Sequence, residues 1–392
     1  MAPRGAAQGG PFAAILVHVM RRYDAFRFVA RALGAAGRDG RTGSGSGDEL
    51  SCGAIGWEAV VELASRQLVT PTLDQALRDQ GRVSELPAEV RDYLEAVHGL
   101  NGERNRGIAD QVVEITAALN AIGTEPVLLK GVAYLVEDLY GDPAARVIGD
   151  IDLLVSAERV EDALGALLAI GYREAGIDDV SFAAHHHRTP LARGDAVAAV
   201  ELHTAPVPQA FSTLLPAERV RRDARPVAVG GHRAWLPAPR DLMVHNIVHG
   251  QLADRHYWSG RVALRPLCDL VRLRLAHDAA IDWPEVLATF DRAGYGGACR
   301  AWLMAAERLL GQAPPAGFEP TFGARFACWR SGAQIRSPRL MALGEAYGYH
   351  RAMLERLRAG PGSRQQLLDR LLHPRGYRRY LRSFKAHRGR ID

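Results

Sequence analysis

The stretch V-L-L-K-G at residues 127–131 and the run R-V-I-G-D-I-D-L-L-V at residues 146–155 decide what this chain is expected to fold into. The second run is apolar and β-branched except for its charged residues, and we predict that it forms a strand carrying Asp150 and Asp152. Successive side chains of a strand point to opposite faces, so both carboxylates share one face. Neighbouring acids on a buried strand repel each other and resist desolvation unless a cation lies between them. The pattern therefore predicts a site for a divalent metal ion and a phosphate-bearing ligand.

The rarity of lysine in this chain also indicates a functional site near the paired acids. Lys130 and Lys385 are the only lysines in a chain that otherwise uses arginine for its positive charges. The ammonium of lysine is a compact point charge, whereas the guanidinium of arginine is broad and planar. A lysine kept in front of Gly131, just upstream of the paired acids, indicates a functional ammonium group. A surface lysine at the start of a helix is the simpler alternative.

Length and composition indicate an ordinary soluble protein. The 392 residues are enough for two or three domains, and 47% are hydrophobic and 24% charged. The net charge is +5, and part of the excess lies in the basic, aromatic segment at residues 374–385. Such a segment attracts nucleic acid or an anionic surface, but a solvated terminal helix is the favoured interpretation.

Cysteine spacing and hydropathy suggest a cytoplasmic location. The chain has four cysteines without C-x-x-C spacing, which indicates neither a zinc ribbon nor a disulfide framework and suits a reducing cytosol. No hydrophobic stretch is long enough to cross a bilayer, so we expect no membrane partner. The apolar run at residues 11–20 is followed by two arginines and no small-residue cleavage site, which argues against a signal peptide.

Changes in periodicity divide the chain into three parts. Residues 1–122 form a predicted helical region with a flexible Gly- and Ser-rich linker at residues 37–47. Residues 123–237 are predicted to form a compact unit of order β-α-β-α-β-β, and residues 238–392 a second helical region with a basic tail. The expected fold class is mixed α/β (α+β), a small mixed-sheet core between two helical flanks.

Individual elements follow from the same patterns. The pattern is helical from residue 57 to about residue 122, with apolar residues at helical spacing at 57–64 and at 90–97, and a longer helix spans about 104–121 with Gly123 as the C-cap. Further predicted helices span residues 12–34, 133–140 and 157–170. The predicted strands span residues 125–129 and 146–155, a hairpin of 182–189 with 197–203 turning at Arg193-Gly194-Asp195, and a short strand near Ala234.

A third carboxylate is needed if two metal ions are to support an in-line displacement at phosphorus. Glu201, in A-A-V-E-L-H at residues 198–203, is an acid in an otherwise apolar strand and fits this role. His203 lies two residues further on, hence on the same face. A salt bridge on an edge strand is the alternative for Glu201, and for His203 a functional and a structural role are equally supported.

The order of these motifs resembles the nucleotidyltransferase-like family of the DNA polymerase β superfamily. The matching elements are L-K-G at residues 129–131, L-Y at 139–140, R-x-x-x-D-I-D-L-L-V at 146–155, G-Y at 171–172 and V-E-L-H at 200–203. More narrowly, the chain is similar to a bacterial branch in which L-K-G stands where most relatives have Gly-Ser. The resemblance covers about residues 125–205 and extends more weakly through residues 241–245 and 267–270.

This resemblance implies transfer of a nucleoside monophosphate from an NTP to a hydroxyl-type acceptor, with release of pyrophosphate. It implies that Asp150, Asp152 and Glu201 bind the metal ions, Mg²⁺ or Mn²⁺, and serve catalysis. The acceptor is a small molecule, a peptide, a protein side chain or RNA, and the preferred base stays open.

The resemblance also implies a nucleotide-binding set. Lys130 and Gly131 take the loop position that holds the triphosphate, where glycine allows close approach and the start of a helix favours an anion. Arg146 is expected to clamp phosphate oxygens, with a salt bridge to one of the acids as the alternative. His203 completes the expected nucleotide-binding residues.

Two rival functions remain at this point. In the first, the same fold only binds nucleotide or a partner and catalyses nothing. In the second, the chain binds nucleic acid through its basic tail, and a steep loss of affinity with salt would support that function. A nucleic-acid partner is the less favoured alternative.

Further histidines have no assigned role. The run His185-His186-His187 lacks a carboxylate or cysteine at ligand spacing, so a polar strand face is favoured over a transition-metal site. His245 and His249 are spaced as in zinc proteases, but asparagine follows His245 where the general base of such enzymes stands. We expect them in helix packing or in an acceptor pocket, which the polar and aromatic residues 254–258 would also line.

Overall fold

The computed structural model describes residues 11–35, 55–175 and 189–358. The predicted linker, most of the first strand of the predicted hairpin, the run His185-His186-His187 and the basic tail lie outside the described residues.

The described chain contains helices on both sides of a group of strands in sequence. The helices are α1 (Pro11–Ala35), α2 (Trp57–Arg66), α3 (Thr70–Asp79), α4 (Ala88–Ala121), α5 (Lys130–Val136), α6 (Val160–Ala169), α7 (Ala217–Arg222), α8 (Pro239–Ile247), α9 (His256–Ser259), α10 (Leu264–His277), α11 (Trp283–Arg292), α12 (Gly296–Leu310), α13 (Phe322–Arg336) and α14 (Pro338–Arg358), with a π-helical turn, η6 (Val248–Ala253), after α8. The strands are β1 (Val127–Leu129), β2 (Asp150–Leu154), β3 (Arg173–Glu174), β4 (Leu191–Ala192), β5 (Ala199–His203), β6 (Arg225–Val229) and β7 (His232–Leu236).

The strands form one mixed sheet of order β3-β4-β5-β2-β1-β7-β6. β2 lies antiparallel to β1 and parallel to β5, so the strand with the acid pair is central in the sheet. The mixed-sheet core between helical flanks is thereby confirmed. β6 was not predicted because proline, here Pro226, disfavours a central strand, but β6 is an edge strand, where proline is tolerated.

The predicted turn at Arg193-Gly194-Asp195 joins β4 to β5, and its Ala196 N–H donates to the Arg193 carbonyl at 3.0 Å. The two strands are antiparallel, with Leu191 opposite Val200. The described residues thus include the turn of the predicted hairpin and the strands β4 and β5 on either side of it.

Helix α4 differs from its prediction at one end. It ends as predicted, with Gly123 at φ 71°, but begins at Ala88 rather than near Arg104 and runs for 34 residues. A β-carbon at Gly102 would lie 3.1 Å from the Ala144 side chain, and one at Gly107 would lie 2.7 Å from the Val197 side chain. These two glycines inside the helix therefore allow its close packing against later loops.

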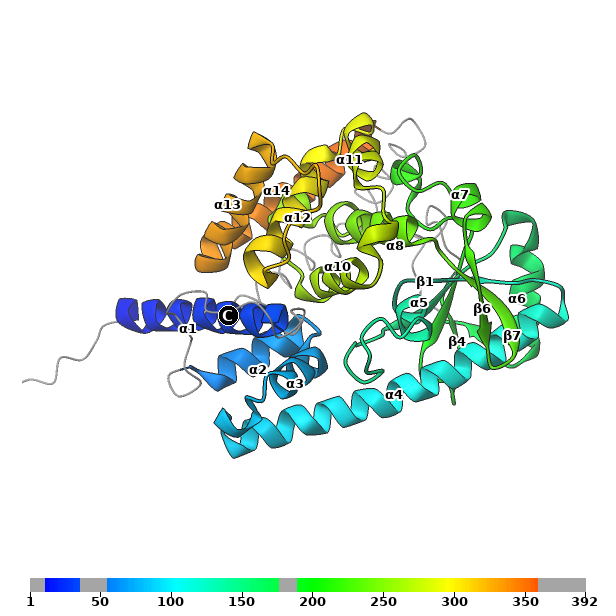
Figure 1. Cartoon of the computed structure of the whole chain (residues 1–392), viewed down its shortest axis with the longest axis horizontal. Helices are drawn as coiled ribbons and strands as arrows, with labels where there is room; N and C mark the ends of the chain where they lie inside the picture. The colour runs from blue at the N-terminus through cyan, green and yellow to red at the C-terminus, as the bar shows by residue number, and fades with distance from the viewer. Residues whose placement is uncertain (1–10, 36–54, 176–188, 359–392) are drawn as a thin grey trace, which may run out of the picture.

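Buried apolar side chains form one continuous core that runs from Ala25 to Leu310. Figure 1 shows α4 along one side of the molecule, from α2 and α3 at one end to the sheet at the other, with α8 and α10 to α14 across from it. The division at residues 122 and 237 stays a prediction, because the core is shared by all three parts. Within the described residues, no helix is both long and apolar enough to span a membrane.

Candidate functional site

The sheet places the predicted acids on neighbouring strands. β2 and β5 run parallel in a register that sets Asp152 opposite Glu201 and Asp150 opposite Ala199. Because side chains alternate along each strand, Asp150, Asp152, Glu201 and His203 share one face. The one-face arrangement expected from the sequence thus follows from the observed register.

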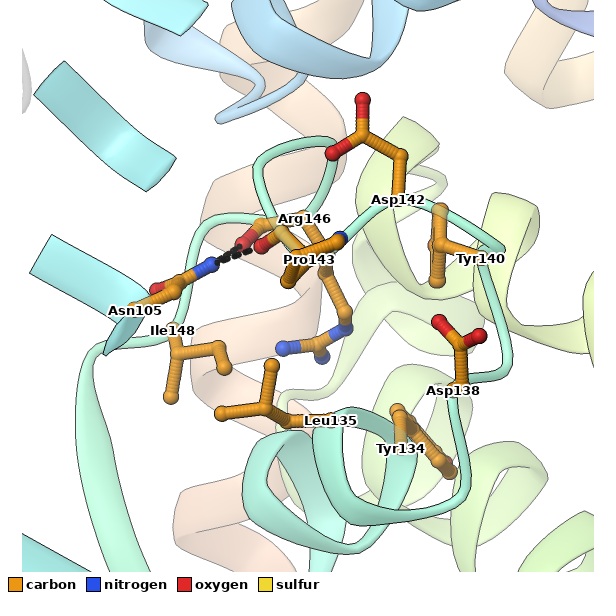
Figure 2. A pocket seen from close by; sticks show the side chains of 9 residues that line it. All are labelled: Asn105, Tyr134, Leu135, Asp138, Tyr140, Asp142, Pro143, Arg146 and Ile148. Atoms are coloured by element: carbon orange, nitrogen blue, oxygen red, sulfur yellow. Dashed lines mark hydrogen bonds between the residues drawn. The ribbon is translucent and has the colours of Figure 1, made fainter. Parts of the chain in front are cut away.

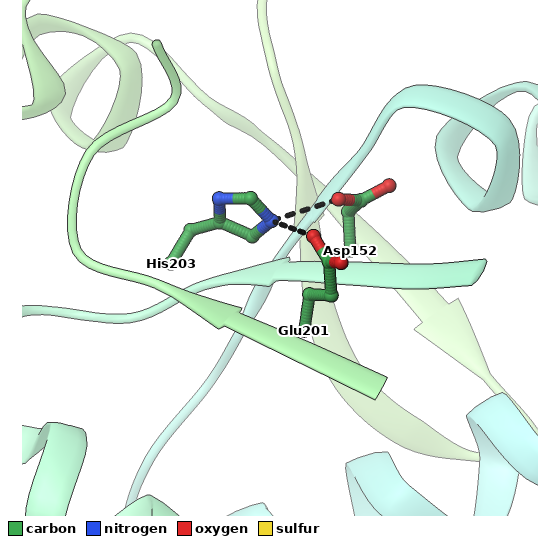
Figure 3. A group of neighbouring side chains, drawn as sticks. All are labelled: Asp152, Glu201 and His203. Atoms are coloured by element: carbon green, nitrogen blue, oxygen red, sulfur yellow. Dashed lines mark hydrogen bonds and ion pairs between the residues drawn. The ribbon is translucent and has the colours of Figure 1, made fainter. Parts of the chain in front are cut away.

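Asp152 is the centre of this group. Its side chain is fully buried, and its Oδ1 accepts hydrogen bonds from Lys130 Nζ at 2.6 Å and from His203 Nε2 at 2.7 Å. The same His203 nitrogen lies 3.5 Å from Glu201 Oε2 (Figure 3). Two residues far apart in sequence, Lys130 and His203, therefore neutralise one buried carboxylate.

Three of these side chains are arranged like metal ligands. Asp152, Glu201 and His203 each offer a donor atom, and the three atoms lie within 4.8 Å of one another. The second oxygen of Asp152, Oδ2, is buried and has no hydrogen-bond partner among the described residues. A buried acceptor of this kind is normally satisfied, and a divalent cation would satisfy it. Two carboxylates and an imidazole form a donor set that suits a divalent cation.

A protein-family comparison agrees with this geometry. The sequence model of the family described as "Uncharacterised nucleotidyltransferase" matches residues 53–311. The chain belongs to this nucleotidyltransferase family. Searches of curated proteins and of solved structures returned no match. The matched residues include the whole sheet and the helices from α2 to α12, and they confirm the family predicted from the L-K-G and D-I-D-L-L-V motifs.

Asp150 lies at the edge of the site. It is the first residue of β2, is only partly buried, and does not belong to the group of three donors, in which His203 takes the third place. Burial raises the pKa of Asp150, and repulsion from Asp152 raises it further. Its role as a metal ligand stays a prediction.

The charges of the inner group stabilise one another. Burial alone would raise the pKa of Asp152, but the nearby Lys130 and His203 outweigh it and lower this pKa strongly. Burial alone would lower the pKa values of Lys130 and His203, but Asp152 raises both. The site therefore holds an ionised carboxylate against a protonated amine at neutral pH.

Lys130 and Gly131 are the first two residues of α5, which follows β1 directly. Lys130 has φ 48°, a left-handed conformation that is unfavourable for a residue with a side chain. A β-carbon at Gly131 would lie 2.8 Å from Arg146 Nη1 and 3.0 Å from Ile148 Cγ2. Glycine is thus required here by close packing, and the expected contact of Gly131 with phosphate stays a prediction.

Arg146 is held away from the acid pair. Its guanidinium forms a two-pronged ion pair with Asp269 of α10, with distances of 2.7 Å and 2.8 Å, and lies 5.1 Å from the centre of the Tyr134 ring. Tyr140 donates a further hydrogen bond to Asp269 at 2.7 Å. Figure 2 shows the Arg146 side chain between α5 and the loop before β2. Arg146 therefore forms a salt bridge, but with Asp269 and not with the paired acids. Its role as a clamp on phosphate oxygens stays a prediction.

Sequence reasoning missed the residues that hold the loop before β2. Asn105 of α4 is fully buried and donates to the carbonyls of Pro143 and Arg146 at 2.6 Å and 2.8 Å, as Figure 2 shows. Asn101 donates to the Arg146 carbonyl at 3.0 Å, and Arg104 donates to the carbonyl of Ile148. Asparagines four residues apart inside a helix were the available signal, because asparagine is a poor helix former.

The C-terminal helices bring further polar groups to the site. His245 of α8 is buried, and its Nε2 has no hydrogen-bond partner among the described residues. Burial lowers the pKa of His245 well below its usual value, and the charges of His249 and Lys130 lower it further. The His249 ring lies 5.5 Å from the His245 ring, and its Nδ1 lies 3.9 Å from the Asp254 carboxylate.

Proposed function

We propose that this nucleotidyltransferase-family chain transfers a nucleoside monophosphate from an NTP to a hydroxyl-type acceptor and releases pyrophosphate. The observation that carries the proposal is the buried group of Asp152, Glu201 and His203 beside Lys130, on adjacent parallel strands. In-line phosphoryl transfer depends on positioning and on stabilising negative charge, and this group supplies both carboxylates and a cation.

Asp150, Asp152 and Glu201 would hold Mg²⁺ or Mn²⁺, with His203 as a further donor. A bound divalent cation would neutralise phosphate charge and activate the attacking oxygen. Lys130 supplies the remaining positive charge and would bind the oxygens of the leaving pyrophosphate. Without a metal ion, His203 orients Asp152 through its hydrogen bond at 2.7 Å, and this Nε2 would give up that hydrogen bond on binding a cation.

The acceptor side of the site would be formed by the C-terminal helices. His245 is buried, which keeps its imidazole uncharged and able to accept a proton from a hydroxyl group. Its Nε2 is the buried nitrogen without a hydrogen-bond partner among the described residues. We assign His245, with His249 beside it, to the acceptor side of the reaction.

The test is the double variant Asp150→Asn/Asp152→Asn, assayed for Mg²⁺-dependent pyrophosphate release in a metabolite screen with labelled NTPs. We expect a loss of about 100-fold or more, because the carboxylates act on the charge of the transition state. The matched control is Glu174→Gln/Asp195→Asn, which removes two exposed carboxylates and should keep full activity. Unchanged pyrophosphate release in the first variant would remove the acid pair from the mechanism.

One observation favours a second candidate function, nucleotide binding without transfer. Asp152 is fully buried, and its Oδ1 already accepts two hydrogen bonds from Lys130 and His203. A protein of the same fold that binds nucleotide without transferring it would also keep these hydrogen bonds. Calorimetry with NTP and Mg²⁺, set beside turnover, separates the two, since binding without any product supports the second candidate.

A further inference from the structure

A separate cavity lies among the outer helices. It has a volume of about 210 Å³ and is lined by α1, the segment from η6 through α9 to residue 262, α12 and α13. Figure 1 shows α1 beside α12 and α13, on the side of the molecule away from the sheet. Lys130, Asp152, Glu201 and His203 do not line this cavity. Both α1 and α13 lie outside residues 53–311, so the family match does not account for it.

The lining of the cavity is strongly cationic. Four arginines contribute to it, Arg27, Arg261, Arg308 and Arg336, and none of its lining residues is an aspartate or a glutamate. Arg336 donates to the Tyr23 hydroxyl at 3.3 Å, and Arg261 lies 3.6 Å from Glu345. Within the described residues, neither Arg308 nor Arg336 has a carboxylate within ion-pair distance. Arg261, Arg308 and Arg336 are exposed, and guanidinium groups that line one cavity attract carboxylate or phosphate oxygens.

The rest of the lining is largely aromatic and aliphatic, with a few polar side chains that include Gln251 and His256. Trp302 and Phe26 are buried beneath it, and Tyr257 adds a third ring. Gln251 is buried among them, and His256 has a buried Nδ1 without a hydrogen-bond partner among the described residues. Aromatic walls with a few polar groups are typical of sites for small organic ligands.

We infer that this cavity is a second binding site, which takes a small organic anion with a planar apolar body. The anionic group would bind the arginines, and the planar body would lie against Trp302 and Tyr257. The site is independent of the nucleotidyl transfer proposed above, because it shares no residue with the acid group.

Phenyl phosphate is the probe, because it combines an anionic group with a planar apolar ring. Its affinity for the whole chain would be measured by isothermal titration calorimetry, without NTP or metal ion, so that the result does not depend on the transfer reaction. We expect phenyl phosphate to bind about tenfold or more tightly than inorganic phosphate or benzyl alcohol, and to bind more weakly as salt rises.

Two variants test the location. Gly332 of α13 lines the cavity, and a β-carbon there would have no neighbour within 4 Å, so Gly332→Leu should fill the cavity without a clash and abolish binding. Gly323→Leu on the same helix is the matched control, since its β-carbon is equally unobstructed and Gly323 does not line the cavity.

The second variant, Arg308→Gln/Arg336→Gln, should weaken phenyl phosphate binding by about tenfold or more. Its control, Arg222→Gln/Arg233→Gln, removes the same charge from exposed positions outside the cavity and should have no effect. Binding that is unchanged in both cavity variants would overturn the inference. So would a wild-type chain that binds phenyl phosphate no better than inorganic phosphate.

Discussion

Single residues carry the charge balance of the site. Asp152 is fully buried, and it stays ionised because Lys130 and His203 both donate to the same oxygen. Lys130 reaches it from a left-handed backbone conformation at φ 48°. Strained backbone conformations of this kind are common at functional sites, where they hold a side chain in one place.

Two substitutions of Lys130 distinguish the effect of its backbone conformation from the effect of its charge. Lys130→Ala and Lys130→Gly both remove the ammonium from Asp152, but glycine adopts the left-handed conformation without strain. We expect Lys130→Gly to be more stable than Lys130→Ala by about 1 kcal/mol in denaturant unfolding, and both to lose pyrophosphate release. Equal stability of the two variants would show that the backbone at this position is unstrained.

Metal affinity should depend on pH through His203. Its Nε2 donates to Asp152, so this nitrogen must lose a proton before it can bind a cation. Because Asp152 and Glu201 raise the pKa of His203 above its usual value despite burial, Mn²⁺ affinity should rise as pH increases through that raised pKa. Below it the affinity should fall about tenfold per pH unit, and His203→Asn should remove this part of the dependence. A pH profile that is the same in both proteins would exclude His203 as a ligand.

At the scale of elements, the site depends on a helix that contributes none of the predicted ligands. Helix α4 begins 16 residues before its expected start, since Ala88 precedes Arg104, and it holds the loop before β2 through Asn101, Arg104 and Asn105. Gly102 brings it close to that loop, at Ala144. The position of Asp150 at the start of β2 is therefore set by helix residues that lie more than 40 positions upstream of it.

Asn105→Ala tests this support. The substitution removes a buried donor and leaves the Pro143 carbonyl without it, so we expect a loss of about 1–3 kcal/mol in the free energy of unfolding. Mn²⁺ affinity should fall as well, because the loop leads directly into β2. Arg106→Ala, on the exposed side of the same helix, should change neither quantity. A destabilised variant with unchanged Mn²⁺ affinity would show that the loop does not position the metal ligands.

At the scale of the whole molecule, a buried ion pair between Arg146 and Asp269 is among the contacts that join the sheet region to the C-terminal helices. Arg146 precedes β2 and Asp269 belongs to α10, and both side chains are largely buried. The continuous core from α1 to α12 explains why the predicted three-part division does not appear as separate cores. A buried ion pair of this kind is costly to break on one side only.

Asp269→Leu should therefore destabilise the protein by about 3–5 kcal/mol, because it leaves the Arg146 guanidinium buried and unpaired. The double variant Arg146→Met/Asp269→Leu should recover most of that loss, as measured by denaturant unfolding. NTP affinity of the double variant then tests the phosphate clamp. Wild-type affinity would assign Arg146 to structure alone, and a large loss would support the predicted contact with phosphate.

The local pattern of residues determined the central strands, the shared face of the acids and the family, because strand periodicity and motif order depend on near neighbours in sequence. The union of residues 88–121 in the single helix α4 and the edge strand β6 were beyond such reasoning, since helix packing and sheet position decide them. Only the tertiary structure decided which side chains meet: His203 with Asp152, and Arg146 with Asp269. Those contacts join residues far apart in sequence, and they depend on strand register and helix packing, which no local pattern encodes.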